Sequence, residues 1–216
     1  MKLVCSIILL SILSSSQAAD KLKVSLYYES LCPGCRYFIQ HQLYSVYTQF
    51  ANYLELDMVP FGNAEFRKVG NKWQFDCQHG PKECYGNIIH ACSLNSSTTT
   101  AALGFIACCE GQQDSTSDQT FQKCASRTGL NFKDLINCKE TIGDDLLAAN
   151  GEKSQKVGYG WVPFVTFNDK FDEAISNRAT EDLKSVVCEY LANIPYACKM
   201  PTSANEISKG VSVCFA

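Results

Sequence analysis

The chain has 216 residues, a net charge of −3 at pH 7, 46% hydrophobic residues and 19% charged residues. This composition is sufficient for a packed core and argues against an intrinsically disordered chain. The sequence contains no block of lysines and arginines, which argues against a nucleic acid as a partner. We therefore expect one good-sized domain, or one domain with a large insertion.

Residues 1–19 are typical of a secretory signal peptide. Lys2 supplies the positive flank, residues 3–13 form a short apolar core, and residues 14–19 offer a small-residue cleavage region. A membrane anchor is the alternative, but a bilayer span needs roughly 18 apolar residues or more. No later segment reaches that length, so we predict no membrane span and entry into the secretory pathway.

A strand, a helix and a second strand are expected next. Residues 24–30 are rich in Val, Leu and Tyr, and residues 54–61 repeat this pattern. Pro33 suits the first turn of the helix between them. Strand, helix and strand with a crossover imply a parallel pair. The apolar positions of the helix recur at helical spacing, at Phe38, Ile39, Leu43, Val46, Tyr47 and Phe50.

Residues 65–158 carry seven cysteines and little alternation of polar and apolar residues. We interpret this region as a disulfide-rich helical insertion in a single domain. Helices are expected over residues 87–94, 101–110, 120–125 and 132–150.

The strand pattern returns over residues 161–167. Asn168-Asp169 is a turn signal, and residues 170–173 are expected to form the returning strand of a hairpin. Residues 180–192 form an apolar face at helical spacing, with Thr180 as the expected cap.

The cysteine count predicts a disulfide framework. Removal of the signal peptide takes away Cys5 and leaves twelve cysteines, an even number in a secretory chain. The sequon that begins at Asn95 lies in a region rich in Ser and Thr, which predicts an exposed, glycosylated loop.

Cys32 and Cys35 form a Cys-x-x-Cys motif between a strand and a helix, which is the thioredoxin-like arrangement. At the start of a helix, unpaired N–H groups stabilise a thiolate, so we expect an exposed Cys32 sulfur with a lowered pKa. Cys35, one turn later, is expected to be more buried. Cys32 attacks a substrate disulfide and Cys35 then releases the product, without a metal or a cofactor.

Two other interpretations of the motif are weaker. A bridge of purely structural value between Cys32 and Cys35 would restrain very little chain. A zinc site needs four ligands. The nearest candidates lack a second Cys-x-x-Cys or a pair of histidines, and they are Cys77, His79, Cys84 and Cys92.

Val162-Pro163 supports the thioredoxin-like interpretation independently. A proline at the start of a strand disturbs sheet pairing, so an edge strand or a turn is the alternative explanation. Thioredoxin folds place a cis-proline loop against the redox cysteines, where its backbone pairs with an extended substrate. Beside Cys32 and Cys35, we predict a cis bond and a substrate-positioning role for Val162 and Pro163.

Residues 77–92 read CQHGPKECYGNIIHAC and resemble the signature C-Q-H-G-x-x-E-C-x-x-N-x-x-x-x-C of the gamma-interferon-inducible lysosomal thiol reductase (GILT) family, with every fixed position met. Residues 26–32, 59–64 and 162–166 resemble three further segments of that family, in the same order. The resemblance covers residues 24–198.

The resemblance implies an α/β, thioredoxin-like fold over residues 20–198 with an inserted disulfide-rich helical subdomain. It implies reduction of protein disulfides at acid pH, in endosomes or lysosomes or after secretion, with a role in innate immunity. Cys32 and Cys35 stand at the catalytic positions. The alternatives are a disulfide oxidase or isomerase on the same scaffold, and a non-enzymatic secreted binding protein.

The resemblance also implies partners and bridges. The partners are disulfide-containing proteins and a reductant, a small thiol or a protein, that the sequence does not identify. Polar positions 78, 79, 83 and 87 are expected to make structural hydrogen bonds. Structural disulfides are expected among Cys77, Cys84, Cys92, Cys108, Cys109, Cys124, Cys138, Cys188, Cys198 and Cys214.

Two of these cysteines, Cys109 and Cys214, are additional to the family pattern. Either they bond each other, or Cys214 links two chains into a dimer; otherwise we expect a monomer. Family members can lose a C-terminal segment, so residues 199–216, a polar tail that we expect to be mobile, are a candidate for removal.

Overall fold

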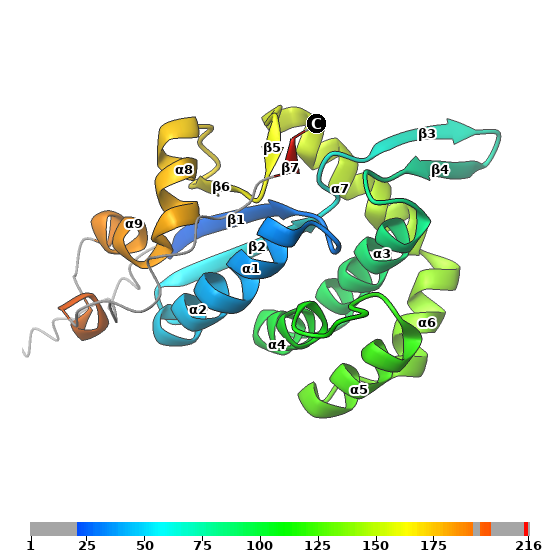
Figure 1. Cartoon of the computed structure of the whole chain (residues 1–216), viewed down its shortest axis with the longest axis horizontal. Coiled ribbons are helices and arrows are strands. Elements are labelled where there is room, and N and C mark those ends of the chain that lie inside the picture. The colour runs from blue at the N-terminus through cyan, green and yellow to red at the C-terminus, as the bar shows by residue number, and fades with distance from the viewer. Residues whose placement is uncertain (1–20, 192–194, 200–213, 216) are drawn as a thin grey trace, which may run out of the picture.

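The computed structural model describes residues 21–191, 195–199 and 214–215 (Figure 1). The predicted signal peptide lies outside the described residues, as does most of the tail. Within the described ranges, no helix combines the length and the apolar character that crossing a membrane requires.

A three-stranded sheet forms the centre of the molecule, in the order β2-β1-β6 (Figure 1). β1 (Leu22–Tyr28) pairs in parallel with β2 (Leu54–Pro60) and antiparallel with β6 (Phe164–Phe167). The side chains of β1 are mostly buried on both faces, which is typical of a strand between two layers of helices. The predicted parallel pair is confirmed.

The crossover between β1 and β2 is an unbroken helical segment that presents the redox motif. It comprises α1 (Pro33–Phe38), the π-helical turn η1 (Ile39–Leu43) and α2 (Tyr44–Phe50). The predicted apolar face is confirmed, because its side chains are buried in the main core. This burial fixes the first turn of α1 at the end of β1.

The insertion begins with a hairpin that sequence patterns did not predict. β3 (Glu65–Val69) pairs antiparallel with β4 (Lys72–Asp76). The helices that follow are α3 (Pro81–Ser96), α4 (Thr99–Glu110), α5 (Asp118–Thr128), α6 (Phe132–Thr141) and α7 (Gly143–Val157). The single helix expected over residues 132–150 is therefore two helices. Both α3 and α7 contact β2, so the insertion packs against that edge of the sheet.

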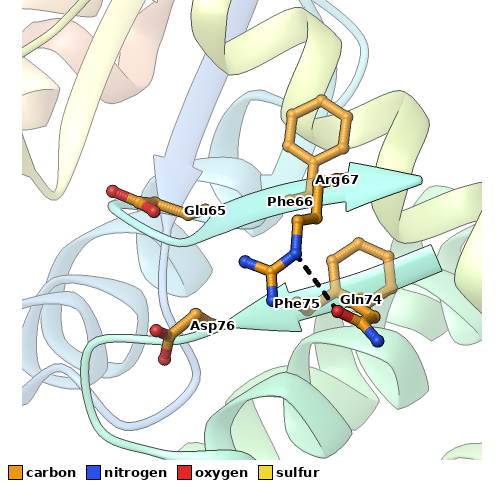
Figure 2. Close-up of a pocket in the computed structure, with 6 residues that line it drawn as sticks. All are labelled: Glu65, Phe66, Arg67, Gln74, Phe75 and Asp76. Atoms are coloured by element: carbon orange, nitrogen blue, oxygen red, sulfur yellow. Dashed lines mark hydrogen bonds between the residues drawn. The ribbon is translucent and has the colours of Figure 1, made fainter. Parts of the chain in front are cut away.

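The hairpin carries a surface cavity of about 400 Å³ (Figure 2). Arg67 Nε donates a hydrogen bond to Gln74 Oε1 across it, at 3.1 Å. Phe66 anchors the hairpin through an edge-to-face contact with Phe61, with 5.4 Å between ring centroids. None of the residues that line the cavity belongs to the redox motif, so we do not assign it to the reductase site.

Two expectations for the last third of the chain are wrong. Residues 170–173 form no returning strand; one bridge joins Phe167 and Lys170, and the chain then enters α8 (Glu173–Glu181). The expected helix over residues 180–192 is divided by Asp182, which caps α9 (Leu183–Tyr190) in place of Thr180. The carboxylate of Asp182 accepts the N–H of Ser185, and this cap is stronger than a threonine within α8 could supply.

Three short elements complete the part of the chain that the structure describes. β5 (Trp161–Val162) immediately precedes β6, and η2 (Tyr196–Lys199) follows α9. β7 (Cys214–Phe215) pairs antiparallel with β5, beside which it lies in Figure 1. The end of the tail is therefore part of the folded structure, contrary to the expectation of a mobile tail.

Candidate redox site

Cys32 is the N-cap residue of α1, where the sequence predicted it, and Cys35 lies one turn further along the helix. Both side chains are 0% exposed. The expected exposure of the Cys32 sulfur is therefore wrong for this structure. The physical reason is a disulfide to Cys214, which covers the sulfur.

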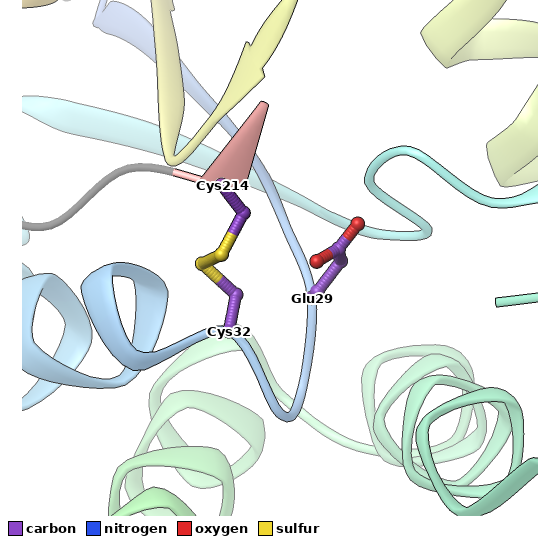
Figure 3. Close-up of side chains that lie close together, drawn as sticks. All are labelled: Glu29, Cys32 and Cys214. Atoms are coloured by element: carbon purple, nitrogen blue, oxygen red, sulfur yellow. A yellow bond between two sulfur atoms is a disulfide. The ribbon is translucent and has the colours of Figure 1, made fainter. Parts of the chain in front are cut away.

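The Cys32–Cys214 disulfide joins residues that are 182 positions apart, with their Cα atoms at 6.3 Å (Figure 3). It is supported by the pairing of β7 with β5, in which Cys214 lies opposite Val162. The two proposed roles of Cys214 are corrected: it does not bond Cys109, and its sulfur is not free to link a second chain. Cys35 is a buried free thiol.

The Val162–Pro163 peptide bond is cis, as predicted. The carbonyl oxygen of Val162 lies 3.8 Å from Cys32 Sγ. The sulfur carries no proton while it is in a disulfide, so this contact becomes a weak S–H···O hydrogen bond only in the thiol form. The structure thus brings together the motif and the proline loop.

Burial raises the pKa of the Cys35 thiol well above its ordinary value. The N–H of Glu29, which donates to Cys35 Sγ at 3.5 Å, opposes this effect. The nearby carboxylates, including that of Glu29 itself, raise the pKa further. Cys35 is therefore protonated in the folded protein and has to lose its proton before it can attack a disulfide.

The carboxyl group of Glu29 lies in a buried cluster with His79 and Glu83, which sequence reasoning missed. Its Oε1 accepts the N–H of Asn63 at 2.7 Å, and its Oε2 lies 3.4 Å from Nδ1 of His79. The same Nδ1 lies 2.6 Å from Glu83 Oε2. Both glutamate side chains are 0% exposed, whereas that of His79 is 32% exposed. Burial, and then the charge of Glu83, raise the pKa of Glu29 to about 8, while the Asn63 N–H lowers it.

Two groups of side chains here have spacings that a metal ion could use. Glu29, Cys32 and Cys214 form one, and Glu29, His79 and Glu83 form the other. In the first, the two sulfurs bond each other. In the second, the 2.6 Å separation of His79 and Glu83 is that of a charge-assisted hydrogen bond. We therefore assign the first to disulfide chemistry and the second to proton chemistry.

Comparison with known proteins agrees with this geometry, which is that of a thiol–disulfide redox site. The sequence profile described as Gamma interferon inducible lysosomal thiol reductase (GILT) matches residues 23–128. GILT-like protein 1 of Drosophila melanogaster is 32% identical over 212 residues, which cover 90% of this chain and 85% of that protein. The chain belongs to the GILT family. It is therefore an enzyme, a thiol reductase.

A vertebrate member of the family is similar to the same extent. The gamma-interferon-inducible lysosomal thiol reductase of Carassius auratus is 33% identical over 189 residues, which cover 83% of this chain and 73% of that protein. The reduced form of the disulfide oxidoreductase DsbG of Mycobacterium tuberculosis superposes with a TM-score of 0.53 at 17% identity, covering 88% of this chain and 89% of that one. The predicted thioredoxin-like fold is confirmed.

The GILT signature packs directly against the redox motif. Asn87 Oδ1 accepts the N–H of Ser30 at 2.9 Å, and Gln78 Oε1 accepts a hydrogen bond from Asn63 Nδ2 at 3.0 Å. These two residues make structural hydrogen bonds, as expected. His79 and Glu83 do more, because His79 lies 3.4 Å from the Glu29 carboxyl and the charge of Glu83 raises the pKa of that carboxyl. A lone glutamate at the end of an apolar strand, three residues before Cys32, was the available sequence signal.

Four bridges hold the rest of the family domain: Cys77–Cys84, Cys92–Cys138, Cys108–Cys124 and Cys188–Cys198. The thiols of the alternative zinc set are used in the first two, so that set is ruled out in this oxidised state. Cys109 is buried and free, so its assignment as a disulfide candidate is wrong. Burial raises the pKa of Cys109, which leaves it an inert core side chain.

Two side chains near the surface complete the site and the insertion. Arg36 lies 3.2 Å from the buried carboxylate of Glu110 and donates to the Glu110 carbonyl at 2.8 Å. This contact ties α1 to α4. Asn95 is exposed, but it lies in the last turn of α3 and not in a loop.

Proposed function

We propose that this protein reduces protein disulfides with Cys32 as the attacking sulfur and Cys35 as the resolving sulfur. The observation that carries the proposal is the bond that Cys32 already makes. Its sulfur, at the start of α1 and beside the proline loop, is joined to a cysteine held in a strand on β5. That is the arrangement of an enzyme bonded to an extended substrate.

The reaction has two steps. The Cys32 thiolate attacks one sulfur of the substrate disulfide; a Cys32–substrate disulfide forms, and the other substrate sulfur leaves and takes a proton. Cys35 then loses its proton and attacks Cys32 Sγ, so the Cys32–Cys35 bond forms and the second substrate sulfur leaves as a thiol. Two electrons pass to the substrate, and a small-thiol or protein reductant returns them.

Val162 and Pro163 position the substrate in this proposal. β7 shows how an extended segment fits: it adds to β5 with its cysteine opposite Val162. Main-chain pairing of this kind depends little on sequence, so it suits an enzyme that accepts many partly unfolded proteins. Asn95, being exposed, is proposed to carry a glycan.

We also propose action at acid pH, in endosomes or lysosomes or after secretion, with a role in innate immunity. The family resemblance supports this, as do relatives in Carassius auratus and Mus musculus that are named lysosomal thiol reductases. A disulfide oxidase is the alternative. A measured reduction potential near about −270 mV favours the reductase, and one near about −120 mV favours the oxidase.

The test is insulin reduction at pH 4.5 with a small-thiol reductant. We expect Cys32→Ser to fall to the rate of the reductant alone, and Cys35→Ser to accumulate a stable enzyme–insulin disulfide. Cys109→Ser is the matched control, since Cys109, like Cys35, is a buried free thiol among the described residues and lies outside the motif. Equal rates for the wild type and Cys32→Ser would eliminate the assignment.

A further inference from the structure

The Cys214 sulfur marks a position that matters for the reaction. It is bonded to Cys32, as a substrate sulfur is bonded to Cys32 between the two steps of the proposed function. Cys214 Sγ therefore stands in for the sulfur that departs when Cys35 attacks. Groups that lie beside it in this structure lie beside the departing thiolate during turnover.

The Glu29 carboxyl is such a group. One of its oxygens, Cys32 Sγ and Cys214 Sγ all lie within 4.8 Å of one another, and Figure 3 shows the carboxyl beside the disulfide. Oε1 is held by the Asn63 N–H, whereas Oε2 is buried and accepts no hydrogen bond from the described residues. A buried carboxylate without a donor, next to a sulfur that becomes an anion, is unfavourable unless one of them carries a proton.

We propose that Glu29 is the general acid that protonates the departing substrate sulfur. The proposal rests on the assignment of Cys32 and Cys35. As Cys35 Sγ bonds Cys32 Sγ, the bond from Cys32 to the substrate sulfur breaks, and the Glu29 proton moves to that sulfur. In the same step the Cys35 proton passes to the Glu29 carboxylate that this leaves, so Cys35 is deprotonated as it attacks. One proton and one electron pair therefore pass to the product, with no other reactant consumed in this step.

The surroundings of Glu29 keep its carboxyl group protonated. Burial raises the pKa of Glu29 to about 8, so the carboxyl holds its proton throughout the acid range. Nδ1 of the partly exposed His79 lies 3.4 Å from Oε2. The titratable groups that face Glu29 or act on it come from five parts of the chain, and they are Cys32, Cys35, His79, Glu83, Tyr159 and Cys214.

The leaving-group dependence of a Glu29→Gln variant tests the proposal. The full-length protein is reduced, freed of reductant and mixed in single turnovers at about pH 5 with two disulfides. Glutathione disulfide releases a basic alkyl thiol that needs a proton; 5,5′-dithiobis(2-nitrobenzoate) releases an acidic aromatic thiol that does not. We expect at least about a tenfold loss with the first and less than about a twofold loss with the second.

Two further variants complete the design. Glu55→Gln removes an exposed carboxyl on β2 and should match the wild type with both disulfides. Glu29→Asp keeps the carboxyl, so it should retain more of the glutathione disulfide rate than Glu29→Gln. It also serves if the glutamine variant does not fold.

Two results overturn the inference: an equal loss with both disulfides, which is the mark of a structural role, or no loss with either. Failure of the proposed function looks different. If Cys32→Ser kept the wild-type rate, Cys32 would not be the nucleophile, and the proposed function itself would be rejected. A leaving-group-independent loss in Glu29→Gln, with Cys32→Ser inactive, rejects only the acid.

Discussion

Glu29 illustrates how one side chain takes its charge from its surroundings. The same glutamate in an exposed loop would be ionised at neutral pH. At the end of β1 it is fully buried and faces Glu83, which raises its pKa to about 8. The sequence shows only a glutamate after an apolar strand, and nothing in that pattern predicts that the glutamate is protonated.

Protonation of Glu29 makes stability depend on pH. Because the folded pKa is raised, to about 8 from roughly 4.3 in an unfolded chain, this contribution is complete below pH 4.3 and is lost as the pH rises through 8. Between pH 6.5 and pH 8, we expect Glu29 to lower the free energy of unfolding by about 1.5 kcal/mol. Denaturant unfolding of the wild type and Glu29→Gln across this range measures it.

Other buried groups do not confuse this comparison. Burial lowers the pKa of His90 to about 3, so His90 affects pH dependence only below roughly 6.5. Burial also raises the pKa of Glu110, and this contribution is common to the wild type and the variant. Unfolding free energies that stay parallel for the two proteins between pH 6.5 and pH 8 would contradict an abnormal Glu29.

At the scale of elements, the turn after β2 makes room for this carboxyl. Gly62 has a φ of +65°, and a Cβ there would lie 2.1 Å from Glu29 Cγ. Gly70, in the turn of the β3–β4 hairpin, has a φ of +62°, but no described atom lies within 4 Å of its Cβ position. The two glycines thus share a backbone conformation and differ in what surrounds them.

Alanine substitutions separate these two effects. Both Gly62→Ala and Gly70→Ala incur the cost of a left-handed conformation, roughly 1–2 kcal/mol. We expect Gly62→Ala to lose about 1–3 kcal/mol more, because the new methyl group displaces Glu29. Unfolding in denaturant measures both. Equal losses would show that the close approach to Glu29 has no energetic weight.

Local patterns predicted the central elements well and the insertion less well. Short apolar runs identified β1 and β2, and helical spacing identified α1 and α2, because their apolar residues pack in one core. The hairpin was missed although Gly70-Asn71 is a turn signal and β4 alternates polar and apolar residues, since both strands are largely exposed and β3 does not alternate. The division of the helix near Asp182 depends on a cap that competes with an unbroken apolar face.

At the scale of the whole molecule, the tail returns to the redox site. β7 pairs with β5, and Cys214 is bonded to the Cys32 sulfur, which the proposed reaction needs as a free thiolate. In this oxidised form Cys32 is not available to a substrate. A reductant has to open the Cys32–Cys214 bond before the first turnover, because cleavage of the tail alone would leave the Cys214 segment bonded to Cys32.

This arrangement predicts a lag. Unreduced wild-type protein added to insulin and a small thiol should begin slowly and then accelerate as the Cys32–Cys214 bond opens. Cys214→Ser should reach its final rate at once, because its Cys32 is not held by the tail. Mass spectrometry of unreduced peptides checks the linkage directly. A Cys32–Cys35 bond in the unreduced wild type, together with no lag, would contradict the arrangement.

The sequence by itself determined the redox motif, the parallel β1–β2 pair, the proline loop and the family. Each is encoded in a short run of residues whose spacing reflects local backbone geometry. Only the tertiary structure decided that Cys214 bonds Cys32 and that Glu29 meets His79 and Glu83. Those contacts join residues distant along the chain, and burial, which no local pattern states, sets their protonation.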